Sequence, residues 1–225
     1  MRSLHVVWDW NGTLLDDLDI VIEALNVGTA RFGVEPIDPD GYRDHFTRPV
    51  RSFYASLFGR PISDMEWDQL NKSFHEEYYA RVTRASLTPG ALDAIDRIRG
   101  LGWSQSLLSM SVHDYLLEVV STHGITEHFV TVAGIRSTTG GLKAAHLRTH
   151  LQTIGESPGD VLLIGDTPDD AAAARDVGAG IVLYDGGSHH LDVLEAVGAP
   201  VAHTLDEAVD LAIEVARGQV QEAGV

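Results

Sequence analysis

The sequence contains no cysteine, so disulfide bonds and thiolate metal sites are excluded. Basic residues are scarce, because 16 lysines and arginines stand against 33 acidic residues and give a formal net charge of −17. Such a surface repels nucleic acids and anionic membranes, so neither is expected as a partner. No apolar run is long enough to span a bilayer, and the N-terminus lacks the apolar segment and cleavage site of a signal peptide. These absences favour a soluble, cytoplasmic protein.

Short apolar runs alternate with amphipathic helical patterns over most of the chain. Helical stripes end at Gly100, Gly124 and Gly155. The runs between them are nearly continuous and rich in β-branched residues, as in strands buried on both faces. They cover residues 4–8, 104–109, 128–134, 160–166 and 180–186. This alternation predicts an α/β fold with a doubly wound, Rossmann-like parallel sheet.

The stretch from about residue 16 to residue 86 breaks the alternation, because it holds helical patterns and no convincing strand. One apolar face begins at Leu18 and ends at Gly33, and Ser63 with Glu66 forms a capping box that starts another helix. We therefore expect two domains. An all-helical cap of residues 16–86 is inserted into an α/β core of residues 1–15 and 87–225.

Polar side chains stand at the carboxyl ends of three predicted strands, at Asp9, Ser109 and Asp166. Ligands of open parallel sheets bind beyond these strand ends. Lys143 opens the helix before the last of these strands, where a cation opposes the helix dipole, and the chain has one other lysine, Lys72. A local rule that is broken without visible compensation indicates function.

Two further helix starts carry capping signals. Thr167 and Asp170 form a capping box with proline at the first helical position, which gives Asp170 a structural explanation that Asp166 lacks. Ser111, with Asp114 three residues later, predicts the start of the helix that follows the Ser109 strand.

Taken in order along the chain, these motifs resemble the haloacid dehalogenase superfamily of hydrolases, in its phosphoglycolate-phosphatase-like branch. The resemblance covers nearly the whole chain and rests on DWNGTLLDD (9–17), a helical cap, LTPGALDAIDRIRGLG (87–102), the strand that ends at Ser109, Lys143, and LIGDTPDDAAAARDVGAG (163–180). It implies an enzyme that hydrolyses a phosphomonoester of a small metabolite. Asp9 would be the nucleophile and would form an aspartyl-phosphate, since an ionised carboxylate needs no base to activate it.

The resemblance also implies a Mg²⁺ cofactor. The ion would be held by Asp9, the backbone carbonyl of Asn11 and Asp166, with Asp170 in support, because these oxygens are the hard ligands that Mg²⁺ prefers. The ion and Lys143 would then explain how so acidic a molecule binds a phosphate.

Other residues would act on the phosphoryl group. Ser109 and Lys143 would grip its oxygens, and Gly12 and Thr13 would shape the loop after the nucleophile. The implied phosphate-binding set is Gly12, Thr13, Ser109, Met110 and Lys143.

Position 11 departs from the family pattern, which usually has a second Asp that exchanges protons with the leaving group and the attacking water. Asn11 cannot do so, and such help is typically worth about 10²–10⁴-fold. Several explanations stay open: a substrate with a good leaving group, a proton from the substrate or a cap histidine, deamidation of Asn11-Gly12, or a decayed enzyme that serves as a phosphate-binding or interaction module. On this evidence alone, restoring Asp at position 11 should raise turnover of alkyl phosphates.

Two other reaction types are less favoured. A phosphonate-cleaving branch of the superfamily also lacks this Asp and uses a cap lysine, but Lys72 lies in a pattern typical of an exposed helix face. A dehalogenase needs no metal, and the acids of GDTPDD argue against it. His45, Arg48 and Arg51 are candidates to contact the leaving group, and no pattern specifies the ester or an oligomeric state.

Overall fold

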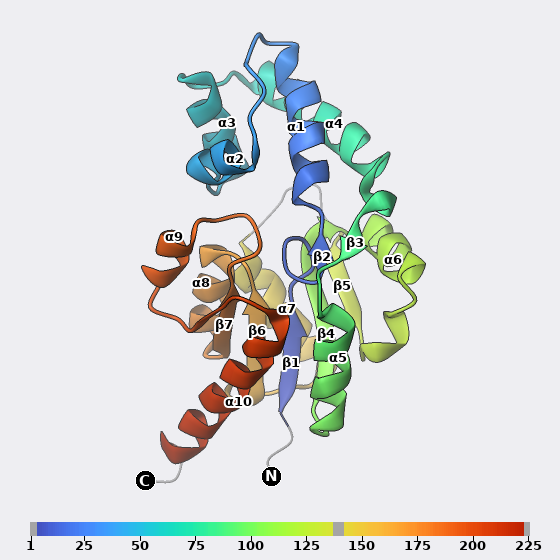
Figure 1. Cartoon of the computed structure of the whole chain (residues 1–225), viewed down its shortest axis with the longest axis vertical. Helices are drawn as coiled ribbons and strands as arrows, with labels where there is room; N and C mark the ends of the chain where they lie inside the picture. The colour runs from blue at the N-terminus through green and yellow to red at the C-terminus, as the bar shows by residue number, and fades with distance from the viewer. Residues whose placement is uncertain (1–3, 137–141, 223–225) are drawn as a thin grey trace.

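A computed structural model describes residues 4–136 and 142–222 (Figure 1). Its main sheet has six strands in the order β5-β4-β1-β6-β7-β8, and every neighbouring pair is parallel. The strands are β1 (His5–Trp8), β4 (Ser104–Val112), β5 (Val132–Ile135), β6 (Val161–Gly165), β7 (Gly180–Tyr184) and β8 (Val201–Ala202). The predicted parallel α/β sheet is confirmed.

Both faces of this sheet are buried, because successive strand residues pack into different apolar clusters. In β6, Leu162 and Ile164 belong to one cluster and Leu163 to the other. The first face is covered by α5 (Ala91–Gly100), α6 (His113–Thr122) and α10 (Leu205–Glu222). The second face is covered by α7 (Lys143–Ile154), α8 (Pro168–Val177) and α9 (Leu191–Glu195). Helices on both faces make the sheet doubly wound.

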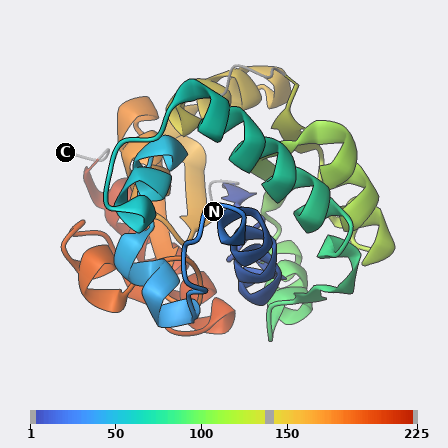
Figure 2. The same ribbon diagram turned by 90° about the horizontal axis from the view of Figure 1, so that it is seen from above.

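The first four helices of the chain build a separate layer beyond one end of the sheet (Figure 1). They are α1 (Leu18–Ala30), α2 (Pro39–His45), α3 (Val50–Phe58) and α4 (Asp64–Tyr79). These helices share an apolar cluster of their own, and α1 packs along α4 (Figure 2). Short 3₁₀ helices lie at Val82–Arg84, Thr126–His128 and Pro158–Asp160.

The chain enters and leaves the helical layer through a two-stranded antiparallel sheet. It pairs β2 (Leu15–Asp16) with β3 (Ser86–Leu87), so that Leu15 faces Leu87 and Asp16 faces Ser86. We propose that the domain boundaries lie at this sheet, close to residues 15–16 and 86–87. Its two-residue strands are too short to give a pattern in the sequence.

Helix ends follow the predicted signals in most places. The capping boxes of Ser63 with Glu66 and of Thr167 with Asp170 are both formed, and Gly155 ends α7 in the left-handed conformation. The prediction that Ser111 starts a helix is wrong, because β4 continues to Val112 and α6 begins at His113 without a side-chain cap. Among the described helices, none has the length and apolar character needed to cross a bilayer.

Candidate active site

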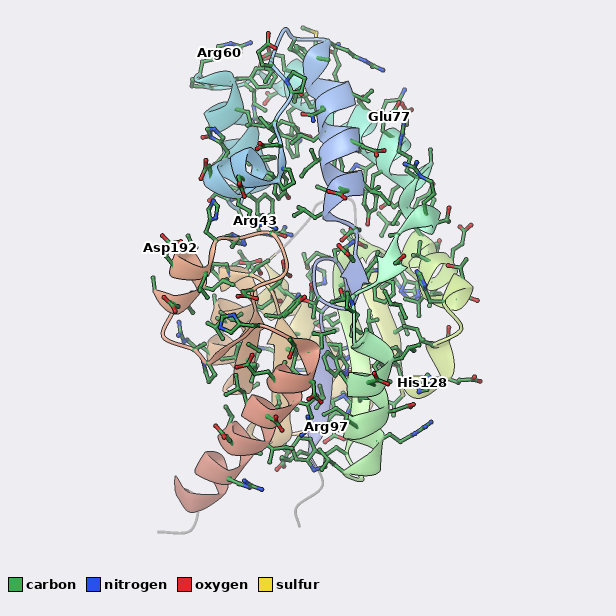
Figure 3. All side chains as sticks on the ribbon, in the orientation of Figure 1. Arg43, Arg60, Glu77, Arg97, His128 and Asp192 are labelled. Carbon is green, nitrogen blue, oxygen red and sulfur yellow. The ribbon has the colours of Figure 1, made fainter. Side chains whose placement is uncertain are left out.

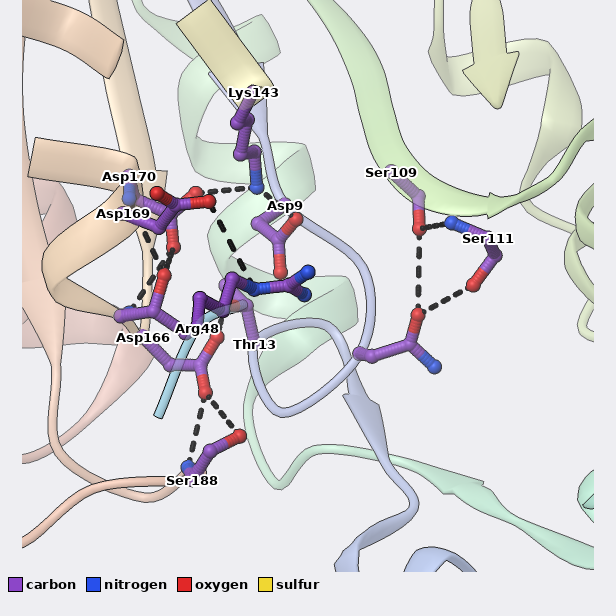
Figure 4. A network of polar contacts seen from close by, with 12 residues as sticks. Asp9, Thr13, Arg48, Ser109, Ser111, Lys143, Asp166, Asp169, Asp170 and Ser188 are labelled. Carbon is purple, nitrogen blue, oxygen red and sulfur yellow. Dashed lines mark hydrogen bonds and ion pairs between the residues drawn. The ribbon is translucent and has the colours of Figure 1, made fainter. Parts of the chain in front are cut away.

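Three buried carboxylates meet where β1 and β6 end (Figure 4). Asp9 directly follows β1, and its backbone N–H donates a hydrogen bond of 2.8 Å to the carbonyl of Ile164 in β6. Asp166 directly follows β6, and Asp170 lies in the first turn of α8. One carboxylate oxygen from each of these acids lies within 4.8 Å of the others. The adjacent parallel strands thus bring together acids that are 157 residues apart in the sequence.

A single ammonium group lies against these acids. Lys143 is the first residue of α7, its side chain is 4% exposed, and it forms ion pairs with the carboxylates of Asp9 and Asp170. When all three acids are ionised, this one cation leaves two negative charges uncompensated in a buried space. Buried charge of this size needs a counterion or protonation.

The pKa values of the cluster reflect this excess of negative charge. Burial raises the pKa of Asp166 to about 8, and the charges of Asp9 and Asp170 add to the rise. Burial also raises the pKa of Asp9 to about 6, although Lys143 opposes the shift. Burial alone would lower the pKa of Lys143, but the carboxylates of Asp170 and Asp9 outweigh burial and raise it. Lys143 is therefore charged at neutral pH, and a divalent cation with hard oxygen ligands fits the acids around it.

Two loops hold the carboxylate of Asp166 in place. Thr13 Oγ1 donates to Asp166 Oδ1 at 3.3 Å, and the backbone N–H and hydroxyl of Ser188 both donate to Asp166 Oδ2 at 3.0 Å. Both loops approach closely through glycine. A Cβ at Gly12, where φ is +72°, would lie 2.6 Å from Asp166 Oδ2, and a Cβ at Gly187 would lie 2.1 Å from the same atom. These positions exclude any side chain, since real Cβ contacts are longer.

Asn11, two residues after Asp9, is hydrogen-bonded to the end of β4. Its Oδ1 accepts hydrogen bonds from Ser109 Oγ at 3.3 Å and Ser111 Oγ at 2.7 Å (Figure 4). Its Nδ2 donates to Asp17 Oδ2 at 2.7 Å and to the hydroxyl of Tyr78 at 2.6 Å. The amide is therefore hydrogen-bonded on both sides.

The residues predicted from the sequence fall into two neighbouring groups. In the first group, the three acids Asp9, Asp166 and Asp170 lie close together and Lys143 pairs with Asp9 and Asp170, while Gly12 and Thr13 lie against Asp166. In the second group, Ser109 contacts Asn11 and the backbone N–H of Ser111, and Met110 lies half-buried beside Ser109 on β4. The loop of residues 9–13 connects the two groups.

A family model described as haloacid dehalogenase-like hydrolase matches residues 6–183, which is most of the chain. The chain belongs to the haloacid dehalogenase-like hydrolase family. The resemblance drawn from the sequence motifs is thus confirmed, and the protein is an enzyme of this hydrolase family.

Curated relatives with phosphatase names align along most of the chain. A phosphoglycolate phosphatase of Mesorhizobium japonicum is 26% identical over 226 residues, which cover 97% of each chain. An N-acetylmuramic acid 6-phosphate phosphatase of Pseudomonas aeruginosa is 27% identical over 183 residues, covering 79% of this chain and 80% of that protein.

Solved structures of the family share the fold. A haloacid dehalogenase-like hydrolase from Streptococcus pneumoniae superposes with a TM-score of 0.80 at 21% identity, covering 92% of this chain and 97% of the other. A mutant of CbbY from Rhodobacter sphaeroides, in complex with xylulose-(1,5)bisphosphate, superposes with a TM-score of 0.72 at 18% identity. The match covers 92% of this chain and 96% of the other.

The helical layer of this haloacid dehalogenase-like hydrolase contacts the core next to the acids. Arg48 Nε lies 3.8 Å from Asp169 Oδ2, and Arg43 Nε donates to the carbonyl of Gly187 at 3.1 Å (Figures 3 and 4). The ring of Phe46 packs edge-on against His189, with centroids 5.3 Å apart. The layer thus covers the side of the site formed by the loop after β7.

The other cap residues singled out in the sequence point elsewhere. His45 is hydrogen-bonded to Ser56 at 2.8 Å, and Arg51 donates to the carbonyl of Ile62 at 2.9 Å, so both have partners within the helical layer. Lys72 is exposed on α4, as its sequence pattern indicates, and its Nζ lies 3.8 Å from Glu76 Oε1.

Sequence reasoning missed Asp17, Tyr78, Ser111 and Ser188. Asp17 is buried, and burial raises its pKa, while hydrogen bonds from Tyr78, Asn11 and Gly12 oppose the rise. A second acid at the end of DWNGTLLDD was the available signal for Asp17. Ser111 was assigned to a helix start because its capping pattern can be read from neighbouring residues, whereas its contact with Asn11 joins residues that are far apart in the sequence. Nothing in the sequence marks Tyr78 or Ser188.

Proposed function

We propose that this hydrolase is a Mg²⁺-dependent phosphatase that cleaves a small phosphomonoester through an aspartyl-phosphate on Asp9. The observation that supports the proposal most strongly is the buried cluster of Asp9, Asp166 and Asp170 with one lysine, at the strand ends where open parallel sheets bind ligands. The phosphatase names of the aligned relatives agree with it.

The donor set suits Mg²⁺. Asp9, Asp166, Asp170 and the backbone carbonyl of Asn11 would hold the ion. Its two positive charges would balance the two negative charges of the acids that Lys143 leaves uncompensated. When bound, the ion supplies charge neutralisation, so that an anionic phosphate can approach an anionic nucleophile.

The chain's own residues then perform two displacements at phosphorus. An oxygen of Asp9 forms a bond to phosphorus while the bond to the leaving oxygen breaks. Water next attacks phosphorus as the bond between phosphorus and the Asp9 oxygen breaks, which releases inorganic phosphate and restores the carboxylate. The leaving oxygen takes a proton from solvent and the attacking water gives one to solvent, since Asn11 exchanges neither. Lys143 binds the phosphoryl oxygens, and Ser109 joins it by turning its hydroxyl from Asn11 Oδ1 toward them. Gly12, Thr13 and Met110 line the loop and strand end around the group.

We take phosphoglycolate as the first substrate to test, because the relative that aligns along 97% of both chains carries that activity in its name. Arg48 Nε, from the helical layer, lies 3.8 Å from Asp169 Oδ2, so Arg48 is a cation available to the carboxylate of such a substrate. A non-catalytic phosphate-binding module is the second candidate. The hydrogen-bonded amide of Asn11 favours it, since this side chain cannot exchange a proton.

The test is turnover of p-nitrophenyl phosphate and phosphoglycolate with Mg²⁺, with EDTA, and by the variant Asp9→Asn. We expect metal-dependent release of phosphate and a loss of at least about 10³-fold in the variant, because the nucleophile is removed. Asp19→Asn is the matched control, since Asp19 is exposed in the first turn of α1. Phosphate binding without turnover of either ester would favour the binding module, and full turnover by Asp9→Asn would refute the mechanism.

A further inference from the structure

The four hydrogen bonds of Asn11 require an amide at this position. Its oxygen accepts from the hydroxyls of Ser109 and Ser111, and its nitrogen donates to the carboxylate of Asp17 and the hydroxyl of Tyr78. The serine hydroxyls can donate or accept, but the ionised carboxylate of Asp17 can only accept, so it requires the N–H arm of the amide on its side.

Asp17 is the reason for this arrangement. The side chain is 2% exposed and is held by donors alone: Asn11 Nδ2 and the Tyr78 hydroxyl on Oδ2, and the backbone N–H of Gly12 on Oδ1 at 3.1 Å. With Asp at position 11, two carboxylates would face each other at 2.7 Å, where buried like charges repel strongly. A flipped amide at Asn11 would likewise turn its oxygen toward Asp17.

We propose that Asp17 is a positioning residue for the reaction and that Asn11 and Asp17 form a matched pair in which the carboxylate stands at position 17 and the amide at position 11. This inference rests on the proposed phosphatase function. Asp17 sets which arm of Asn11 faces Ser109, and it fixes the Gly12 N–H in the loop that follows the nucleophile.

The pair also joins the loop to both attachments of the helical layer. Asp17 directly precedes α1, and Tyr78 lies in the last turn of α4 and donates to Asp17 Oδ2 at 2.6 Å. Loop 9–13, the end of β4 and the base of the helical layer therefore share one hydrogen-bond network. Loss of the pair should misplace groups around the phosphoryl group without removing any of them.

Exchange of the two side chains tests the pair. In Asp17→Asn the new amide directs an N–H at Gly12 N–H or Asn11 Nδ2, or Asn11 turns over and loses the hydrogen bonds that Ser109 and Ser111 donate to its oxygen. In Asn11→Asp two carboxylates meet. We expect each single variant to lower kcat for p-nitrophenyl phosphate by about tenfold or more, with KM changed by less than about threefold. The sequence alone led us to expect that Asn11→Asp raises turnover of alkyl phosphates, and the proposed pairing predicts a loss instead.

The double variant Asn11→Asp with Asp17→Asn keeps the charge and restores the pairing. The amide now at position 17 can accept from Gly12 N–H through its oxygen and donate to the carboxylate now at position 11. The other oxygen of that carboxylate accepts from Ser109 and Ser111. We therefore expect kcat to recover to within about threefold of the parent enzyme, although the two single losses multiplied would be about a hundredfold.

Controls separate positioning from folding and from the proposed function. Tyr78→Phe removes one hydroxyl and should lower kcat in the same direction, whereas Asp19→Asn should not. Melting temperatures identify variants that do not fold, and intact-mass measurement verifies that Asn11 has not deamidated. Single losses that multiply in the double variant, or full kcat in Asp17→Asn, would overturn the pairing while leaving the Asp9 mechanism intact. Turnover that survives Asp9→Asn would instead remove the proposed function itself.

Discussion

Position 11 shows, at the scale of one residue, why a motif has to be read together with its partners. In the sequence, Asn11 is a departure from a family pattern, and the absent acid is the natural focus. In the structure, the amide has partners 6, 67, 98 and 100 residues away, at Asp17, Tyr78, Ser109 and Ser111. No local pattern can give these contacts, so the suitability of the amide becomes apparent only in the fold.

Gly187 is a second single residue on which the site depends. A Cβ there would lie 2.1 Å from Asp166 Oδ2, so Gly187→Ala must push the loop away from the acid and break the two hydrogen bonds from Ser188. We expect the Mg²⁺ concentration for half-maximal activity to rise by about tenfold or more, because an acid that loses its supporting hydrogen bonds binds metal less well. A magnesium titration of phosphatase activity measures it.

Gly159→Ala is the matched control for this substitution, since a Cβ at Gly159 meets no atom within 4 Å. It should leave the magnesium titration unchanged. A titration that is the same for Gly187→Ala and the parent enzyme would contradict the close-approach argument.

At the scale of helices and strands, the sequence predicts best where a pattern is long and local. The apolar runs locate five strands of the main sheet, and the strand-end rule then places Asp9 and Asp166 together, because adjacent parallel strands end at the same edge. The strands β2, β3 and β8 have two residues each, which is too short to show a hydrophobic periodicity. Ser111 was misassigned because a capping signal and a serine at the end of a strand look alike.

The opposite end of the sheet contains a pH-sensitive pair of buried histidines. His5 in β1 is hydrogen-bonded to Ser104 at 2.8 Å and Ser106 at 2.7 Å, and Ser106 is bonded to His150 in α7 at 2.7 Å. Burial lowers the pKa of each histidine to about 4, and His150 adds to the shift at His5. Neither histidine accepts a proton in the folded protein near neutral pH.

This pair should make the fold less stable in mild acid. Because each folded-state pKa lies below the unfolded value of 6.5, the stabilisation is complete above pH 6.5 and is lost as pH falls toward 4. The loss is up to about 3 kcal/mol per histidine. His150→Gln keeps a partner for Ser106 but cannot titrate, so its unfolding free energy should fall less between pH 7 and pH 4.5. Urea titrations at the two pH values measure the difference.

His146→Gln on the same helix is the control, and it should retain the pH dependence of the parent protein. An equal loss of stability in acid for His150→Gln and the parent would show that the histidine pair does not contribute.

At the scale of the whole molecule, the net charge of −17 and the buried acids both add electrostatic repulsion to the folded protein. Both make the metal-free protein self-repelling. When all three acids are ionised, the two negative charges that Lys143 leaves uncompensated concentrate that repulsion where the core and the helical layer meet. A ligand that binds only the folded state stabilises it by mass action. The response of the entire fold to Mg²⁺ therefore reports on the site without relying on catalysis.

We expect Mg²⁺ to raise the melting temperature and EDTA to reverse the rise. At about a hundred times the dissociation constant, the gain is about 2.7 kcal/mol, or roughly 5–10 °C for a chain of this size. The gain should be larger at pH 8.5 than at pH 6, because Asp166, with a pKa raised to about 8, must lose its proton to bind metal. Differential scanning calorimetry measures the melting temperatures. A sample with NaCl at the same ionic strength as the Mg²⁺ sample separates metal binding from general screening of charges.

Asp166→Asn should raise the melting temperature of the metal-free protein and reduce the further rise that Mg²⁺ produces. Without metal at pH 8.5, above the raised pKa of Asp166, the variant should melt at a higher temperature than the parent protein, because one of three mutually repelling buried carboxylates has become neutral. With Mg²⁺, its gain should be small, because the amide is a weaker ligand for a hard cation than the carboxylate it replaces. Asp19→Asn, exposed on α1, should show the parent's behaviour in both conditions. If Asp166→Asn gained as much from Mg²⁺ as the parent, the ion would have to bind elsewhere, and the acids at the strand ends would not form the metal site.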